Sequence, residues 1–432
     1  MRNNQTKTKM IKSGFIGLIF VFYAGNILFA QTVYETKVYS NQINSLRVEV
    51  VDELISEPFI ELNGNAILGV SFDVLYQAQG RYTYSIIHCD ADWQKSSLSP
   101  IEYMDGFQRM PINDYGQAIT TTTHYTNYRL FLPNENVRFK VSGNYVIQVF
   151  DEDSPERILF SARFGVYEQM VGINATVSSN TDISFNQGHQ QVGFQINTQR
   201  MQVVSPQTEL KVFVTQNNRL DNIVSNLQPT IVANNSLTYE HIPALIFDAG
   251  NEYRRIEFLT NRYSGMGIER IRYFNPYYHA EVMIDQSRSK QSYQYDQDQN
   301  GRFFISCLNC QSPDTEADYY IVHFAYASQF IPDGYIYLNG NMFQNRLDEQ
   351  SKMDYNRETR QYEKAILLKQ GHYNYQYLFV PNGETKGQSA MTEGNFFQTE
   401  NEYTILVYYR PMGGRFDRLI GKTTIRNMQN NR

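Results

Sequence analysis

Cysteine and tryptophan are both scarce in this sequence, which has three cysteines and one tryptophan among 432 residues. Cys89, Cys307 and Cys310 are too few for a disulfide framework, and an odd number leaves at least one thiol unpaired. Cys307 and Cys310 form either a structural bridge or two free thiols. Gln-Ser-Pro follows Cys310 where a redox site would need a helix start to lower the thiol pKa, so redox chemistry is not expected.

The motifs of common enzyme classes are missing as well. The seven histidines are widely separated, and none has the i, i+4 spacing of a helical zinc site. No nucleophile elbow, phosphate loop or zinc signature occurs. His88 lies beside Cys89, Asp90 and Asp92, but it continues a strand-like alternation, which favours a structural histidine over a catalytic one. The sequence therefore predicts a non-enzymatic protein without catalytic residues or a cofactor.

One phrase resembles a metal site in part. Asp296, Asp298, Asn300 and Gly301 match the first half of a calcium-binding loop, but its twelfth position is Cys307 instead of glutamate. Without that bidentate carboxylate the loop lacks its strongest ligand, and Asn-Gly is already explained by a tight turn. No metal site is predicted.

Positive charge is not concentrated anywhere in the chain, whose formal net charge is −6. Lysines and arginines are scattered among carboxylates, which argues against a nucleic-acid partner. Residues 1–30 are read as a signal peptide, because four basic residues precede the apolar run GFIGLIFVFYAGNILFA. Cleavage is expected after Ala30, with Ala24 as the alternative. The mature protein is then expected to be soluble, without membrane insertion.

Tyrosine and phenylalanine are abundant, at 33 and 27 residues, which favours half-buried sheet. Apolar residues alternate with polar ones at a period of two in several segments, and no helical stripe is comparable. The clearest alternating sets are Ile158, Phe160, Ala162, Phe164 and Val166; Val192, Phe194 and Ile196; Leu210, Val212 and Val214; Ala280, Val282 and Ile284; and Tyr373, Tyr375, Tyr377 and Phe379. The sequence thus predicts an all-β protein.

Turn dipeptides separate these segments and predict two-residue hairpins. They are Asn63-Gly64, Asn300-Gly301, Asp333-Gly334, Asn339-Gly340 and Asn382-Gly383. Hairpins imply antiparallel sheets. Without crossover helices, each sheet must bury its apolar face against another sheet, so tandem immunoglobulin-like β-sandwiches are predicted.

Polar breaks near 167–171 and 285–299 divide the mature chain into three predicted domains, at 31–167, 168–285 and 286–432. The segment DQSRSKQSYQYDQDQ is the predicted linker before the third. That last segment, with DGYIYLNGNMF followed by GHYNYQYLF, resembles the early-set immunoglobulin-like modules that accompany starch and glycogen enzymes. The resemblance implies the topology but not the sugar site, because the tryptophans that stack on glucose have no counterpart.

A more specific resemblance runs through the first segment. HCDADW, EYMDGF, INDY, YRLFLPNE and SGNYVIQVF, in this order, resemble the plug-protein family of the type IX secretion system of Bacteroidota, and the likeness returns in YYRPMGGRFDRLIG. It implies a periplasmic protein, associated with the outer membrane through its partner, that seals the mouth of a very large translocon barrel and has no active site.

Partner-binding residues are expected in the aromatic loops of the first segment, at Trp93, Tyr103, Phe107 and Tyr115. Trp93 is also expected to pack beneath residues 103–115 and hold that loop. Two other classes stay open. Tandem sandwiches with exposed tyrosines also suit an exported carbohydrate-binding or adhesion protein, and period-two strands suit an outer-membrane barrel, although the loops are irregular for one.

Overall fold

β-strands dominate the structure, a computed structural model that describes residue 1 and residues 32–53, 56–76, 79–201, 203–233, 235–427. The chain divides into two units, Met1–Thr32 and Val33–Arg432, and all the described strands belong to the second. The predicted signal peptide and both of its cleavage sites lie outside the described residues, Met1 excepted. The predicted β class is confirmed. Most strand pairs are antiparallel, while β3, β21 and β22 make parallel pairs. No helix in the described part of the chain is long and apolar enough to cross a membrane.

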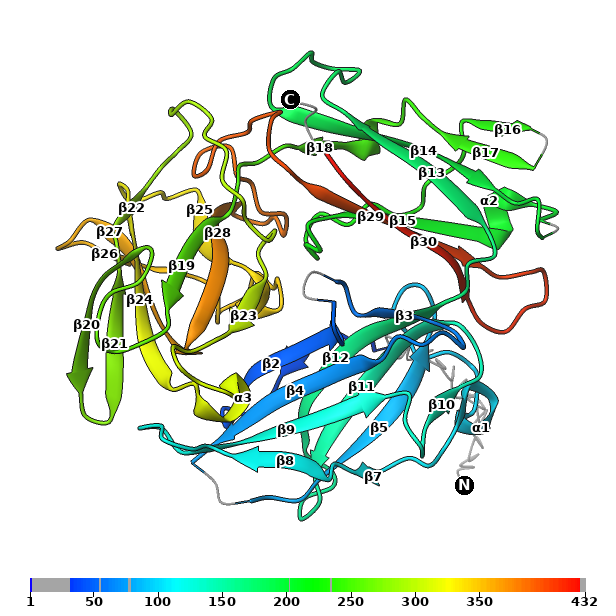
Figure 1. The fold of residues 1–432 in the computed structure, drawn as a ribbon. Helices are drawn as coiled ribbons and strands as arrows, with labels where there is room; N and C mark the ends of the chain where they lie inside the picture. The colour runs from blue at the N-terminus through cyan, green and yellow to red at the C-terminus, as the bar shows by residue number, and fades with distance from the viewer. Residues whose placement is uncertain (2–31, 54–55, 77–78, 202, 234, 428–432) are drawn as a thin grey trace. The chain divides into compact units, whose positions relative to one another are not determined.

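The first core lies between two sheets built from the N-terminal part of the chain (Figure 1). One sheet has the order β1-β12-β11-β5-β7 with β3 beside β12, the other the order β2-β4-β9-β8, and β10 pairs with β6. The elements are β1 (Lys37–Val38), β2 (Ile43–Val50), β3 (Phe59–Glu61), β4 (Leu68–Leu75), β5 (Tyr82–Cys89), α1 (Pro100–Tyr103), β6 (Met104–Asp105), β7 (Met110–Pro111), β8 (Asp114–Gln117), β9 (Tyr125–Leu132), β10 (Arg138–Phe139), β11 (Gly143–Asp151) and β12 (Ile158–Tyr167).

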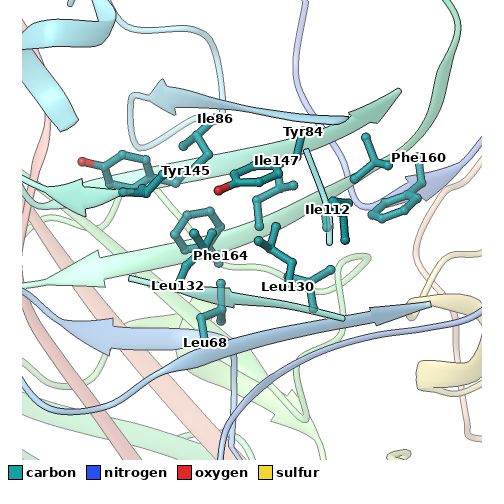
Figure 2. Close-up of a cluster of buried hydrophobic side chains, with 14 of the residues drawn as sticks. Leu68, Tyr84, Ile86, Ile112, Leu130, Leu132, Tyr145, Ile147, Phe160 and Phe164 are labelled. Atoms are coloured by element: carbon teal, nitrogen blue, oxygen red, sulfur yellow. The ribbon is translucent and has the colours of Figure 1, made fainter. Parts of the chain in front are cut away.

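Side chains from both sheets meet in this core. Figure 2 shows Ile147 and Phe164 facing Leu130 and Leu132, and these four belong to one buried cluster. Because successive side chains in a strand point to opposite faces, the alternation along β12 places its apolar set in the core. Burying each such side chain contributes about 1.5–3 kcal/mol.

The second core combines strands from the middle of the chain with the last two strands. One sheet has the order β13-β14-β17-β16 with β18 beside β14, and the other the order β15-β29-β30. The elements are β13 (Gly172–Ser178), β14 (His189–Asn197), α2 (Pro206–Glu209), β15 (Leu210–Gln216), β16 (Ile231–Ala233), β17 (Ser236–Tyr239), η1 (Pro243–Leu245), β18 (Ile246–Asp248), β29 (Glu402–Tyr409) and β30 (Arg418–Arg426). In Figure 1 the red strands β29 and β30 run beside the green β15.

The third core lies between a six-stranded and a four-stranded sheet. The orders are β20-β21-β24-β27-β26 with β22 beside β24, and β19-β28-β23 with β25 beside β28. The elements are β19 (Arg254–Phe258), β20 (Ile268–Phe274), β21 (Tyr277–Val282), β22 (Asp285–Gln286), β23 (Phe303–Ile305), α3 (Pro313–Glu316), β24 (Tyr319–Ala327), β25 (Gly334–Asn339), η2 (Asn341–Phe343), β26 (Asp354–Asn356), β27 (Gln361–Lys369) and β28 (Gly371–Pro381).

Strand pairing groups the chain differently from the boundary predicted at 285/286. β19 and β21 precede that boundary, yet β19 pairs with β28 and β21 with β24, inside the third core. β29 follows the boundary by more than a hundred residues and pairs with β15 of the second core. The chain thus enters the third core early and returns to the second core at its end.

The segment predicted as a linker, 285–299, is bonded along its length to the third core's edge. Asp285 accepts hydrogen bonds from the hydroxyls of Tyr375 and Tyr377, both at 2.8 Å. Arg288 donates from Nε to the buried carboxylate of Glu393 at 2.7 Å. The polar side chains of this segment therefore bond to hydroxyls and to a buried carboxylate. This accounts for the lack of aliphatic residues, and the segment is not a free linker.

The predicted turns adopt the expected backbone in part. Positive φ angles occur at Asn63 (60°), Asn300 (51°), Gly301 (84°) and Gly383 (82°). Asn382-Gly383 reverses the chain between the bridged residues 379 and 388. The turns at 63–64 and 333–334 do not close hairpins, because β3 pairs with β12 and β24 with β27. The turn dipeptides therefore marked places where the chain reverses direction, but they did not identify which strands pair.

Candidate functional site

Trp93 lies in the loop after β5, on the side of β12 instead of beneath residues 103–115 as predicted. Its indole ring stacks on Arg163, whose Cζ is 4.4 Å from the ring centroid. The backbone N–H of Trp93 donates to the carbonyl of Asp90 at 2.9 Å, and the residue has a φ of 63°. Arg163 is itself fixed, because its Nε donates to the carbonyl of Tyr34 at 2.6 Å. The indole therefore belongs to a half-buried cation–π pair.

Replacing Trp93 with alanine is expected to lower the free energy of unfolding by about 1–2 kcal/mol, the range for a partly desolvated cation–π pair. This is smaller than the cost of removing a fully buried aromatic ring, about 3–5 kcal/mol. Urea denaturation of the whole chain measures the change, and Trp93→Phe, which keeps a ring over Arg163, is the matched control. A loss as large as that for a fully buried ring would contradict the half-buried placement.

The other three predicted partner-binding residues differ in how exposed they are. Tyr103 is buried, and its hydroxyl donates to the carbonyl of Ile86 at 2.7 Å, so its ring is not available to a partner. Phe107 is 81% exposed, whereas Tyr115 is 39% exposed and contacts the ring of Tyr128. The four predicted residues do not form one patch.

His88 and Cys89 are both buried at the end of β5. Nδ1 of His88 lies 2.8 Å from the hydroxyl of Ser96, and Nε2 lies 3.3 Å from the carbonyl of Ser142. Burial lowers the pKa of His88 to about 4 and raises the pKa of the free Cys89 thiol to about 12. Burial thus holds the histidine neutral and the thiol protonated, and neither state suits a nucleophile.

The half-motif of a calcium loop is occupied by protein contacts. Asp296 forms an ion pair with Arg255. Asp298 accepts hydrogen bonds from the backbone N–H groups of Tyr253 and Asn300. In the described residues no group of three or more His, Cys, Asp or Glu side chains has the geometry to hold a metal ion. Cys307 and Cys310 are joined by a disulfide, which was one of the two predicted states.

Sequence reasoning missed a buried charge cluster that joins the first and second cores. Asp417, between β29 and β30, is fully buried. It accepts hydrogen bonds from the backbone N–H of Ala91 at 3.0 Å, Nζ of Lys211 at 2.9 Å and Nε of Arg410 at 2.8 Å. Burial alone would raise the pKa of Asp417, but these donors hold it below its ordinary value.

The same cluster brings together two distant motifs that carry the family resemblance. Ala91 and Asp90 belong to HCDADW, and Asp417 belongs to YYRPMGGRFDRLIG. Asp90 also accepts a hydrogen bond from the backbone N–H of Asp417 at 3.0 Å and pairs with Arg410 at 2.8 Å. The two phrases therefore meet in space, and their joint occurrence was the sequence signal for this contact.

A second buried cluster joins the first and third cores. Nζ of Lys369, at the end of β27, lies 2.6 Å from Oδ2 of Asp73 on β4, and both side chains are buried. The same oxygen accepts a hydrogen bond from the hydroxyl of Tyr319 at 2.7 Å, and Oδ1 accepts one from Asn127 at 2.8 Å. Both oxygens of this carboxylate are thus bonded, as a buried charge requires.

Ion pairs also join the second and third cores. Glu402 on β29 is buried between Arg302, at 2.7 Å, and Arg426, at 3.1 Å. Arg219 donates to the carbonyl of Gly387 at 2.8 Å while it is paired with Asp221. Each pair of cores is thus connected by buried polar contacts.

Comparison with known proteins gives two matches. Residues 43–168 match the family model described as Type 9 secretion system plug protein 1st domain. A crystal structure of a hypothetical protein from Parabacteroides merdae ATCC 43184 is similar, with 58% sequence identity and a TM-score of 0.91, and the match covers 92% of this chain and all of that chain. No curated protein matches the sequence significantly.

The fold and its contacts define a β-sheet protein of three sheet-on-sheet cores that are locked together by buried charges. The matched first domain contains HCDADW and most of the first core. The chain contains the first domain of the type IX secretion system plug protein family, over residues 43–168. The presence of this domain indicates a structural role in type IX secretion and a location in the cell envelope.

Proposed function

We propose that this protein is a non-enzymatic plug subunit that binds the type IX outer-membrane translocon and seals its periplasmic side. The observation that carries the proposal is the match of residues 43–168 to the first domain of the plug family. A seal must keep its shape while it blocks a pore. The buried contacts between the cores support this, because breaking the Lys369–Asp73 pair would leave unpaired charges away from water.

The proposal extends to the architecture. We propose that each core is an immunoglobulin-like β-sandwich and that the third resembles an early-set module. Support comes from the two sheets that pack on each core and from the length of β28, whose tyrosines Tyr373, Tyr375 and Tyr377 are all buried. Those rings stabilise the core, so the tyrosine-rich strand offers no stacking platform for a sugar.

A surface beside α1 is the proposed contact with the translocon. It keeps Phe107 from the predicted partner-binding residues and adds two other exposed apolar side chains. Ile101 is 75% exposed and Met412 is 90% exposed. Arg415, three residues after Met412, pairs with Glu102 of α1 at 2.7 Å. This ion pair holds the loop between β29 and β30 next to α1. Phe107 follows α1 after a two-residue strand. Preformed apolar anchors of this kind lose little conformational entropy on binding.

Replacing Ile101, Phe107 and Met412 together with serine is expected to abolish co-purification of the translocon barrel from native envelopes while the variant stays folded. Serine at Ile183 and Phe185, two exposed apolar residues in the loop between β13 and β14, is the matched control and should leave the complex intact. Removing residues 428–432 should also leave it intact. Recovery of the barrel by the triple variant would exclude this surface as the contact.

The same purification separates the proposed function from its alternative. A very large outer-membrane protein that co-purifies supports the plug role. A sugar polymer in its place would support an exported carbohydrate-binding or adhesion protein. The periplasmic location is tested by protease digestion of intact cells and of spheroplasts, where only the latter should expose this chain.

A further inference from the structure

A cavity of about 140 Å³ lies where the three cores converge, and the plug role does not account for it. Its walls come from all three cores, including Phe59 of β3, Phe213 of β15 and Arg302 before β23. Trp93 and Arg163 also line it. An apolar engineered cavity of about 150 Å³ in another protein holds benzene, so this one has room for a single ring or branched side chain.

One wall of the cavity is apolar. Phe59, Phe213, Leu406 and Tyr408 line it, and the rings of Phe213 and Tyr408 are 5.5 Å apart. The hydroxyl of Tyr408 donates to Asn144 at 2.7 Å, so this wall presents the ring instead of a polar atom. Such a wall fits an apolar group about the size of a benzene ring.

The remaining lining carries polar groups whose hydrogen-bonding capacity is not used up by the protein. Glu57 is 5% exposed, and its Oε2 accepts no hydrogen bond from any described residue; Nζ of Lys422 is 3.7 Å away. Oδ1 of buried Asn345 likewise accepts none from the described part of the chain, although Nδ2 donates to the carbonyl of Asn218 at 3.2 Å. Two buried acceptors in one cavity call for a ligand that donates N–H groups.

Arg163 contributes hydrogen-bond donors to the cavity wall, where Glu57 and Asn345 contribute acceptors. Its Nε is bonded to the carbonyl of Tyr34 and its plane is stacked on Trp93, which fixes the guanidinium at the cavity wall. Burial lowers the pKa of Arg163 to about 10, so the group is charged at neutral pH. A fixed, charged guanidinium binds a carbonyl or carboxylate oxygen with good geometry.

We propose that this cavity binds a peptide segment through one apolar side chain and its adjoining peptide group. A peptide unit offers an N–H donor to Glu57 or Asn345, a carbonyl oxygen to Arg163, and a side chain to the apolar wall. Ile223, one of the lining residues, is 38% exposed, and the proposal places the entry of the segment beside it. Because all three cores contribute residues, an occupant is held by the whole assembly.

The single tryptophan makes occupancy directly measurable, since Trp93 is the only tryptophan and lies in the cavity wall. N-acetyl-L-phenylalaninamide is titrated into the full-length mature protein, and Trp93 emission is recorded. A saturable change is expected. Acetamide, which has the peptide group alone, and benzene, which has the ring alone, are each expected to bind at least about tenfold more weakly, because each lacks one of the two sets of contacts.

Two variants test the polar contacts. Arg163→Lys keeps the charge but loses the planar fork. Glu57→Leu removes, at similar volume, the acceptor that receives no hydrogen bond from a described residue. Each variant is expected to weaken binding by about tenfold. Arg129→Lys, the same change on a β9 residue away from the cavity, should bind like the wild type. If one variant fails to fold, the other still tests whether the polar contacts contribute to binding.

Three results would overturn the proposal. Emission that never saturates with N-acetyl-L-phenylalaninamide would leave a cavity that holds only water. If benzene bound as tightly as the amide, the cavity would be a site for apolar molecules, and its polar groups would add nothing to binding. Tighter binding of free phenylalanine than of the amide would assign an amino acid instead of a peptide segment.

Discussion

Lys369→Met is expected to lower the free energy of unfolding by about 3–5 kcal/mol, the cost of removing one partner of a buried ion pair. The substitution keeps most of the side-chain volume but leaves Asp73 fully buried without its cation. The hydroxyl of Tyr319 and the amide of Asn127 still donate to this carboxylate, but neither neutralises it. Urea denaturation followed by circular dichroism measures the change.

Arg81→Met is the matched control for this prediction. Arg81 immediately precedes β5 and pairs with Asp153 at 2.9 Å, but its side chain is largely exposed. Water solvates the carboxylate that the substitution leaves behind, so the urea midpoint should be unchanged. Equal midpoints for Lys369→Met and the wild type would mean that the Asp73 contact does not hold the first and third cores together.

Ionisation of one buried carboxyl group, Glu252, is expected to contribute a decrease of about 3 kcal/mol to the free energy of unfolding as the pH rises from 4.5 to 7. Burial raises the pKa of Glu252 from its ordinary value of 4.5 to about 7, although the Tyr293 hydroxyl donates to it. Within this window the native state binds a proton that the unfolded state has released, so each increase in pH favours unfolding. Burial raises the pKa of Asp298 to about 6, which adds a decrease of the same sign.

Glu252→Gln isolates this effect, because glutamine is neutral at every pH and can still accept the Tyr293 hydrogen bond. Relative to the wild type, the variant's free energy of unfolding should therefore rise by about 3 kcal/mol between pH 4.5 and 7. His88 acts in the opposite direction between about pH 4 and 6.5, since the unfolded state binds its proton first, so a His88→Gln background sharpens the comparison. A Glu252→Gln curve parallel to the wild type would show that Glu252 is charged in the native state.

Local periodicity identified strands well because it depends only on neighbouring residues. Tyr373, Tyr375 and Tyr377 alternate along β28 and are all buried, as expected. The alternation at Ala280 and Val282 continues in the sequence to Ile284, yet Ile284 lies beyond β21 and is exposed. A buried face predicts that some sheet covers it but carries no information about which strand of the chain supplies the cover.

The contacts between cores could not be predicted from the sequence for a different reason. Lysine and aspartate are usually solvated, so Lys369, Asp73 and Asp417 look like surface residues. Each is buried only because distant residues supply its hydrogen bonds. Trp93 was misplaced in the same way, since its partner Arg163 is a charged residue on another strand. Family motifs were the one sequence signal that connected such pairs.

The position of β29 in the second core has a consequence for biosynthesis. A ribosome completes β15 long before it reaches β29, so the edge of β15 that pairs with β29 stays open in the nascent chain. An unpaired strand edge of this kind favours aggregation while synthesis continues. A message truncated before residue 402 would therefore yield an aggregation-prone fragment even though most of the polypeptide, including the entire first core, had been made.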